Sequence, residues 1–298
     1  MRDKLPVSKI TFHCCWEETP QHQLSPLVWR DRIEWQFKKI ACITIKRQCN
    51  LCAVRKGCIV AFLFTPEFWF EGKLQHPLGS LPLPWVPRYP ADSVSPDFLL
   101  EITLVGKKAI GLLPYWFVAV DRLGKTKKPQ FAVQSVSSQT EEGERLLYDA
   151  AGSSLYTDPG FTVPKTFSGV KRIRLDIQTP MRLFERKRPL LNPSFGHIVM
   201  SIARRAETLA LCYGEEPVSI DGCWREADQS IITTAALHWQ EQVAFSKRQK
   251  ETVSLGGLMG SLEFEGNMEP FGELLGMGEL IGVGKGTALG LGRFALSS

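Results

Sequence analysis

The sequence predicts an α+β protein with two domains in tandem. The 298-residue chain is long enough for two domains of ordinary size, each with a core of its own. Apolar residues recur along it with the period of strands and of helices in turn. A polar stretch with several glycines and prolines, residues 141–169, separates two halves that follow the same plan, so we place the domain boundary there.

The first half reads as strand, helix, strand, strand, helix, strand. Ser25 supplies an N-cap and Pro26 a first-turn proline, which together define the start of the first helix. The six elements are expected at residues 7–12, 26–41, 59–64, 98–105, 109–120 and 130–136. This order is that of a ferredoxin-like (RRM-like) unit. We expect residues 1–145 to form one such domain, with a cysteine-rich insertion at residues 42–58 and a proline-rich loop at residues 75–96.

The second half repeats the plan over residues 165–298. Its elements are expected as a strand at 171–178, a helix at 195–213, strands at 238–245 and 258–264, a short helix at 268–275 and a last strand at 293–296. The predicted fold is therefore two tandem ferredoxin-like domains with a cysteine-rich insertion in the first.

Composition narrows the class of protein. Hydrophobic residues make up 44% and charged residues 22%, as in globular proteins, and no run of eighteen apolar residues predicts a membrane span. The first residues have no apolar region of the secretory kind, so the cytoplasm is the expected location and a membrane is not an expected partner.

Basic residues outnumber acidic ones by 36 to 31. An excess of 5 suits an anionic partner, but it also suits many metabolic enzymes. The basic residues gather in two clusters, at residues 171–188 and 247–250. Each cluster is either a nucleic-acid-binding surface or a solvated face.

Eight cysteines without a secretory signal favour free thiols or metal ligands over disulfides. Four of them, Cys42, Cys49, Cys52 and Cys58, lie within one short segment and are enough thiolates for a tetrahedral structural zinc site. Only one pair has the C-x2-C spacing, so unliganded thiols are the alternative. The other four cysteines are expected to be simple thiols in strands or helices.

Five glycines surround a lysine near the end of the chain. Residues 282–293 read Gly-Val-Gly-Lys-Gly-Thr-Ala-Leu-Gly-Leu-Gly-Arg. Glycine lets backbone N–H groups approach a phosphate and adopts positive φ without steric cost, and Lys285 adds a positive charge. The alternative is a glycine-rich hairpin that binds nothing. The spacing from Gly278 to Gly284 does not fit a P-loop, and the loop opens no helix of a dinucleotide-binding unit.

This loop resembles the C-terminal signature of the CRISPR-associated repeat-RNA-processing endoribonucleases of the RAMP superfamily. Other stretches that resemble the same family are residues 177–183, 204–209, 239–249, 255–260, 268–275 and, for its cysteine-bearing members, 25–64. The resemblance implies an endoribonuclease that binds CRISPR repeat RNA. It also implies cleavage by the ribose 2′-hydroxyl without a catalytic cofactor, which leaves a 2′,3′-cyclic phosphate and a 5′-hydroxyl.

The resemblance also suggests which residues act. The RNA-binding residues are expected to be Lys247, Arg248, Gly284, Lys285, Gly286 and Arg293. The catalytic residues are expected to be His22, Arg30 and Lys285. His22 precedes the first helix, where the family places a catalytic histidine or tyrosine, and histidine titrates near neutrality. One departure is Gly282, which stands where cysteine-bearing relatives have a histidine.

Two other functions stay open at this point. A non-catalytic guide-RNA-binding subunit of a CRISPR effector complex would share the fold and the loop. A metal-binding protein unrelated to RNA is suggested only by the cysteines.

Overall fold

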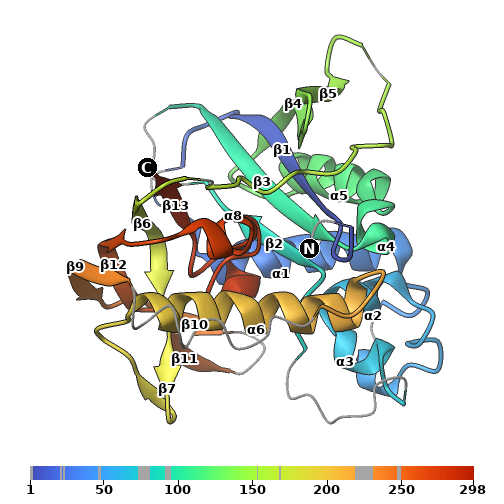
Figure 1. The fold of residues 1–298 in the computed structure, drawn as a ribbon. Helices are drawn as coiled ribbons and strands as arrows, with labels where there is room; N and C mark the ends of the chain where they lie inside the picture. Colours follow the sequence, from blue (N-terminus) through green and yellow to red (C-terminus); the bar gives the residue numbers. More distant parts are fainter. Residues whose placement is uncertain are drawn as a thin grey trace. The chain divides into compact units, whose positions relative to one another are not determined.

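The computed structural model describes residues 3–20, 22, 24–45, 48–72, 81–90, 95–152, 154–167, 169–218, 231–246 and 250–298. The chain forms two compact units (Figure 1). The first is Pro6–Thr162, and the second is Val163–Ser298 together with the residues up to Leu5. Within the described ranges, no helix is both long enough and apolar enough to cross a membrane.

The first unit is built on one five-stranded antiparallel sheet of order β2-β3-β1-β4-β5. Its strands are β1 (Val7–Trp16), β2 (Trp85–Arg88), β3 (Asp97–Val105), β4 (Phe131–Thr140) and β5 (Gly143–Asp149). The first four follow the ferredoxin-like order, and β5 adds an edge strand. Because β5 pairs with β4 and Thr162 donates to the Val7 carbonyl at 2.8 Å, this unit continues past the expected limit at residue 145.

Helices α1 (Pro26–Ala41) and α5 (Leu113–Thr126) pack against each other and complete this unit. The start of α1 is as predicted, because the Ser25 hydroxyl accepts from the Val28 N–H at 3.4 Å and Pro26 is the first helical residue. Aromatic side chains fill the core between helix and sheet. Those that contact one another around one end of β1 are Trp16, Trp29, Phe98 and Phe131.

The second strand of this unit was predicted in the wrong place. Residues 59–64 form a helix, α2 (Ile59–Phe64), followed by α3 (Pro66–Trp69). Every residue from Val60 to Phe64 is buried, so the run carries no periodicity that separates strand from helix. The strand is instead β2, inside the expected proline-rich loop. Pro87 is accommodated there because β2 is an edge strand, where a missing N–H costs no ladder hydrogen bond.

The predicted helix at residues 109–120 is also divided. It forms α4 (Lys107–Ile110) and α5, with Gly111 and Leu112 between them. A short 3-10 helix, η1 (Cys49–Leu51), lies in the cysteine-rich insertion.

The second unit contains a four-stranded sheet of order β13-β6-β12-β9, the same ferredoxin-like order. Its strands are β6 (Arg172–Met181), β9 (Ile232–Gln240), β12 (Gly257–Glu265) and β13 (Phe294–Ser297). Helices α6 (Phe195–Tyr213) and α8 (Gly272–Ile281) pack on each other, and two 3-10 helices are η2 (Glu269–Phe271) and η3 (Thr287–Leu289). The predicted fold of two ferredoxin-like domains is confirmed.

Two hairpins extend this second unit. The strand expected at residues 238–245 is broken after Gln240, because β10 (Val243–Ser246) turns away and pairs with β11 (Glu251–Ser254). The other hairpin joins β7 (Phe184–Glu185) to β8 (Arg188–Pro189) and lies beyond the end of β6 (Figure 1).

Candidate functional site

The glycine-rich loop connects α8 to β13 and is held in a left-handed backbone at five positions. Gly282, Gly284, Gly286, Gly290 and Gly292 have φ values of 74°, 78°, 88°, 74° and 70°. Residues with a Cβ rarely adopt this conformation, so glycine is required at these turns of the chain.

The N–H groups of the loop are largely used inside the protein. Lys285 donates to the Arg182 carbonyl at 2.9 Å, and Gly292 donates to the Pro180 carbonyl at 3.0 Å. The N–H of Gly284 donates to the Ser201 hydroxyl on α6 at 3.2 Å. The loop is therefore fastened to the end of β6 and to α6, and the Gly284 N–H is not free for a phosphate. Contact of Gly284 and Gly286 with RNA stays a prediction.

Close backbone packing explains why side chains are excluded here. A Cβ on Gly284 would lie 2.4 Å from the Arg182 carbonyl oxygen, and one on Gly292 would lie 1.8 Å from the Val283 carbonyl oxygen. The glycines thus serve docking of the loop, and the exposed Lys285 side chain is the group that the loop presents to solvent.

Lys285 and Arg182 lie over one aromatic ring. The Lys285 Nζ is 4.4 Å from the centre of the Phe184 ring, and the Arg182 guanidinium carbon is 5.8 Å from it. Arg182 also donates from Nη1 to the Ser254 carbonyl at 2.6 Å. The ring and this hydrogen bond hold both cations in place without neutralising their charge.

The β7–β8 hairpin adds three more cations beside Phe184. Its turn residues Arg186 and Lys187 have positive φ values of 48° and 68°, a backbone that residues with side chains adopt only when the surroundings impose it. We call the five cations of this region the loop–hairpin cluster. Its members are Arg182, Arg186, Lys187, Arg188 and Lys285.

No member of the loop–hairpin cluster has a carboxylate within ion-pair distance in the part of the chain that the structure describes. Basic residues elsewhere in the same unit do have one. Arg172 is 2.8 Å from Glu265, and Arg174 is 2.9 Å from Asp176. The cluster therefore carries uncompensated positive charge that an anionic partner would stabilise.

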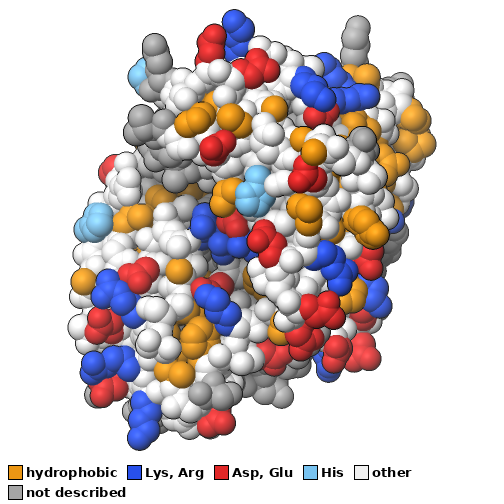
Figure 2. Space-filling view, turned by 90° about the horizontal axis from the view of Figure 1, so that it is seen from above, with side chains coloured by type: hydrophobic (Ala, Val, Ile, Leu, Met, Phe, Trp, Pro, Cys, Tyr) orange, Lys and Arg blue, Asp and Glu red, His pale blue; other side chains and the backbone are white. Residues whose placement is uncertain are grey.

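Charge is mixed on one face of the molecule. On the face shown in Figure 2, basic side chains are interspersed with acidic ones and with apolar patches. This face as a whole thus shows no broad positive field for a polyanion.

A partly buried arginine on α6 binds the residue at which the loop begins. The Arg205 Nε on α6 donates to the carbonyl of Ile281, the last residue of α8, at 2.8 Å. Burial lowers the pKa of Arg205 to about 10. The side chain therefore caps the negative end of α8 at the point where the loop begins.

Arg293 lies at the exit of the loop. Its N–H donates to the Thr179 hydroxyl at 2.9 Å, and that hydroxyl donates to the Gly290 carbonyl at 2.9 Å. The backbone at Arg293 is thus fixed to β6, and its partly exposed side chain stays a predicted RNA contact.

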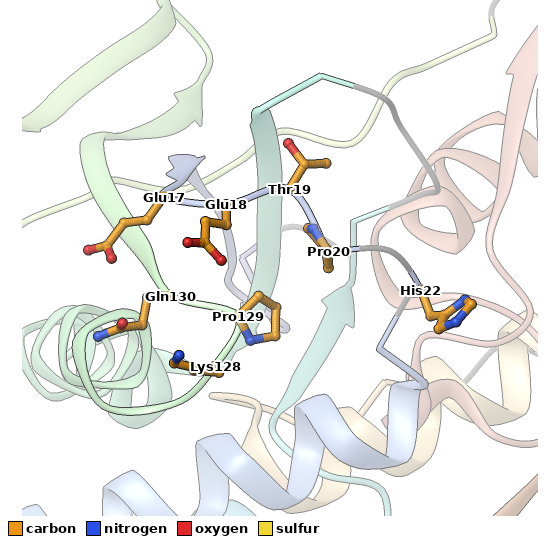
Figure 3. A pocket seen from close by; sticks show the side chains of 8 residues that line it. All are labelled: Glu17, Glu18, Thr19, Pro20, His22, Lys128, Pro129 and Gln130. Atoms are coloured by element: carbon orange, nitrogen blue, oxygen red, sulfur yellow. The ribbon is translucent and has the colours of Figure 1, made fainter.

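His22 is exposed in the segment between β1 and α1. It lines a pocket of about 630 Å³ with two acidic side chains and residues from the segment between α5 and β4. The other lining residues are Glu17, Glu18, Thr19, Pro20, Lys128, Pro129 and Gln130. Figure 3 shows His22 at one end of this pocket, beyond Pro20, with its ring turned away from Glu17 and Glu18.

Arg30 lies in the second turn of α1 and is partly buried. Its Nε is shielded from solvent and has no hydrogen-bond partner among the described residues. His22 and Arg30 belong to the unit Pro6–Thr162, and Lys285 belongs to the other unit. Lys247 and Arg248 lie outside the described residues, as does His76.

The zinc site expected at Cys42, Cys49, Cys52 and Cys58 is not supported. Among the described residues, no three histidine, cysteine, aspartate or glutamate side chains are arranged to hold a metal ion. The Thr44 hydroxyl lies 3.9 Å from the Cys42 Sγ and 3.8 Å from the Cys52 Sγ, between two thiols. Burial raises the pKa of Cys49, which favours the thiol over the thiolate that a metal would need.

Comparison with known proteins finds similarity to one family over the C-terminal part of the chain. Residues 175–294 match the family model of the CRISPR-associated endoribonuclease Cas6. This matched stretch is similar to the Cas6 endoribonuclease family. Residues 5–159 match a second model, described as an N-terminal domain. No curated protein matches the chain by sequence.

Solved Cas6 structures have the same fold over nearly the whole chain. Thermus thermophilus Cas6 (TTHB231) aligns with a TM-score of 0.56 at 12% identity, covering 98% of this chain and 99% of its own. A Cas6 (TTHB231) product complex gives 0.57 at 13% identity with the same coverage. A Cas6 (TTHA0078) product complex gives 0.53 at 14% identity, covering 99% and 100%. These likenesses establish the tandem fold.

The sequence pattern did not point to several residues of this site. Phe184 sits among the basic residues 182–188, and an aromatic inside a basic run is a signal that was available. Ser201 and Arg205 look like ordinary polar positions on a helix, and only the docking of the loop onto α6 gives them a role.

Proposed function

We propose that this protein is an endoribonuclease of the Cas6 kind, which binds CRISPR repeat RNA and cuts the precursor transcript at one bond without a metal ion. The observation that carries the proposal is the loop–hairpin cluster, five cations around the glycine-rich loop that have no carboxylate within ion-pair distance among the described residues. Such a cluster binds RNA through phosphates, with affinity that falls as salt rises. The named product complexes of structural neighbours support the same class of substrate.

The proposed reaction is an internal transfer at phosphorus. A base takes the proton of the ribose 2′-hydroxyl, the 2′-oxygen bonds to the phosphorus, and the bond from phosphorus to the 5′-oxygen breaks. An acid protonates the leaving 5′-oxygen, which leaves a 2′,3′-cyclic phosphate and a 5′-hydroxyl. Cations next to the phosphate stabilise the charge that develops on its oxygens.

His22 is assigned the proton-transfer step. It is exposed, so substrate can reach it, and an imidazole ring can both accept and donate a proton. Arg30 and Lys285 are assigned to charge stabilisation, because guanidinium and ammonium groups bind phosphate oxygens directly.

The first test separates the mechanism from simple binding. Repeat RNA with a 2′-deoxy substitution at the cut site keeps its phosphates but lacks the nucleophile. We expect it to bind normally and remain uncut, and we expect native RNA to be cut in the presence of EDTA. Cleavage of the 2′-deoxy RNA at the same bond would refute the mechanism.

The second test uses paired variants. His22→Ala should lower the cleavage rate about a hundredfold to ten-thousandfold without changing RNA affinity, and His238→Ala, an exposed histidine of the other unit, should have no effect on the rate. Lys285→Ala should weaken binding and reduce its salt dependence, whereas Arg172→Ala, already paired with Glu265, should do neither. The same loss of binding is expected of Lys247→Ala and Arg248→Ala.

A further inference from the structure

The ammonium group of Lys285 is held by an aromatic ring rather than by an acid. Its Nζ lies 4.4 Å from the centre of the Phe184 ring, inside the range of about 6 Å over which a ring face attracts a cation. Among the described residues this ammonium makes no hydrogen bond or ion pair. Lysine has a flexible four-carbon chain, so without the ring the ammonium of an exposed lysine would sample many positions. The ring therefore determines where this charge lies.

The ring is itself fixed in place by the backbone on either side of it. The Leu190 N–H donates to the Leu183 carbonyl at 3.0 Å, which closes the β7–β8 hairpin next to Phe184. Leu183 is only 6% exposed, so the strand that carries the ring is anchored in the core of its unit. The Lys285 N–H donates to the Arg182 carbonyl at 2.9 Å, two residues before the ring. The glycine-rich loop and the hairpin are thus fastened to each other beside the contact between lysine and ring.

The acidic residue of the hairpin is directed away from Lys285. Glu185 follows Phe184, and neighbouring side chains of a strand point to opposite faces. The Glu185 carboxylate lies 4.0 Å from the Nε2 of His197 on α6. A carboxylate beside Lys285 would neutralise its charge and compete with a phosphate, whereas a ring attracts the ammonium and leaves the charge uncompensated. The arrangement is that of a cation prepared for an anionic partner.

We propose that Phe184 is a positioning residue for RNA binding, whose ring holds the Lys285 ammonium at the place where a phosphate of the RNA binds. In this role the ring acts on the RNA only through the lysine. Arg182 also lies over the ring, with its guanidinium carbon 5.8 Å from the centre. It depends less on the ring, because its Nη1 donates to the Ser254 carbonyl at 2.6 Å. The inference rests on the proposed RNA substrate.

Replacement of Phe184 by fluorinated phenylalanines is the sharpest test. Fluorine withdraws electrons from the ring face and weakens its attraction for a cation, with little change in the size of the ring. Affinity for repeat RNA with a 2′-deoxy cut site should fall stepwise from the native ring to the monofluoro and the trifluoro ring, by roughly two- to fivefold over the series. The melting temperature should not follow this order, because the packing of the ring is kept. The same replacements at Phe161, an exposed phenylalanine of the other unit, should leave affinity unchanged.

Ordinary variants test whether the ring acts through Lys285. Phe184→Leu keeps an apolar side chain without a ring face and should lower affinity roughly two- to fivefold, whereas Phe184→Tyr keeps the face and should bind like the wild type. The salt dependence of binding should be unchanged in Phe184→Leu, because Lys285 keeps its charge, but reduced in Lys285→Ala. The double variant should bind about as weakly as Lys285→Ala alone.

The outcomes distinguish the two proposals. If wild-type protein binds no repeat RNA, the proposed function fails. If it binds RNA and fluorination of Phe184 leaves the affinity unchanged, the positioning role is refuted and the function stands. A loss of affinity in Phe184→Leu that is equally large in the Lys285→Ala background would refute it too, by showing that the ring acts independently of the lysine.

Discussion

Gly284→Ala tests the conclusion that the glycine-rich loop is shaped by its own docking. The residue has a φ of 78°, and a Cβ there would lie 2.4 Å from the Arg182 carbonyl oxygen. Gly169, in the same unit, has a φ of 70° with no atom within 4 Å of its hypothetical Cβ. Gly169→Ala is therefore a matched control that carries the backbone penalty without the clash.

The magnitudes follow from this difference. An alanine in the left-handed region costs about 1 kcal/mol at either position. In Gly284→Ala the Arg182 peptide must also move by about 1 Å to restore an ordinary contact with the new Cβ. This movement breaks the hydrogen bond from the Lys285 N–H, worth about 1 kcal/mol, and strains the surrounding backbone. We expect about 3 kcal/mol in all, so the melting temperature of this unit should fall by roughly 10 °C, against about 3 °C for Gly169→Ala.

Scanning calorimetry of both variants measures the two shifts directly. Gly284→Ala should also weaken RNA binding, because Lys285 is displaced from Phe184, and Gly169→Ala should not. Equal melting temperatures for the two variants would refute the reasoning, since only the contact with Arg182 distinguishes them.

Three further outcomes are expected. Arg205→Met should lower the free energy of unfolding, measured with urea, by about 1–3 kcal/mol, because the Ile281 carbonyl loses its charged donor. Arg204→Met, on the exposed face of α6, should change the free energy of unfolding by no more than about 0.5 kcal/mol. Ser194→Ala should cost about 1 kcal/mol by the same assay, because it removes the capping box of α6, and an unchanged midpoint would contradict this. Burial raises the pKa of Cys212 from 9.0 to about 11, so at pH 9 its alkylation in native protein should be about fiftyfold slower than in denatured protein. The stability contributed by the neutral thiol should be complete below pH 9 and lost as the pH rises toward 11. Equal alkylation rates in native and denatured protein would disprove the shift.

Local signals in the sequence were sufficient for several elements. The start of α1 was predicted from Ser25 and Pro26. The bounds of α6 were predicted from its apolar spacing, because one face of the helix is buried and the other is exposed to solvent. The element order then gave the ferredoxin-like topology.

Elements that lack one buried and one exposed face could not be predicted correctly from the sequence. The run that forms α2 is buried on all sides, and its length fits a short strand or a short helix equally well. Pro87 made the strand β2 look like a loop in the sequence. Proline is tolerated there because β2 is an edge strand, where the missing N–H costs no hydrogen bond to a neighbouring strand. Both outcomes depend on tertiary neighbours.

The site was predictable in its chemistry but not in its contacts. The glycines and Lys285 marked the loop, yet its N–H groups bind Pro180, Arg182 and Ser201, which are remote in sequence. The four clustered cysteines suggested a metal by their number alone, and number does not establish ligand geometry.

The N–H groups of the glycine-rich loop largely form hydrogen bonds within the protein, so the motif alone does not indicate RNA cleavage. Each left-handed glycine is demanded by folding of the second unit, whether or not RNA is ever cut. A relative that has lost nuclease activity would need the same glycines to fold. A sequence search based on these glycines would therefore find active and inactive homologues alike. The side chains at positions 182–188 and 285 are the ones that would distinguish a homologue that binds RNA from one that shares only the fold.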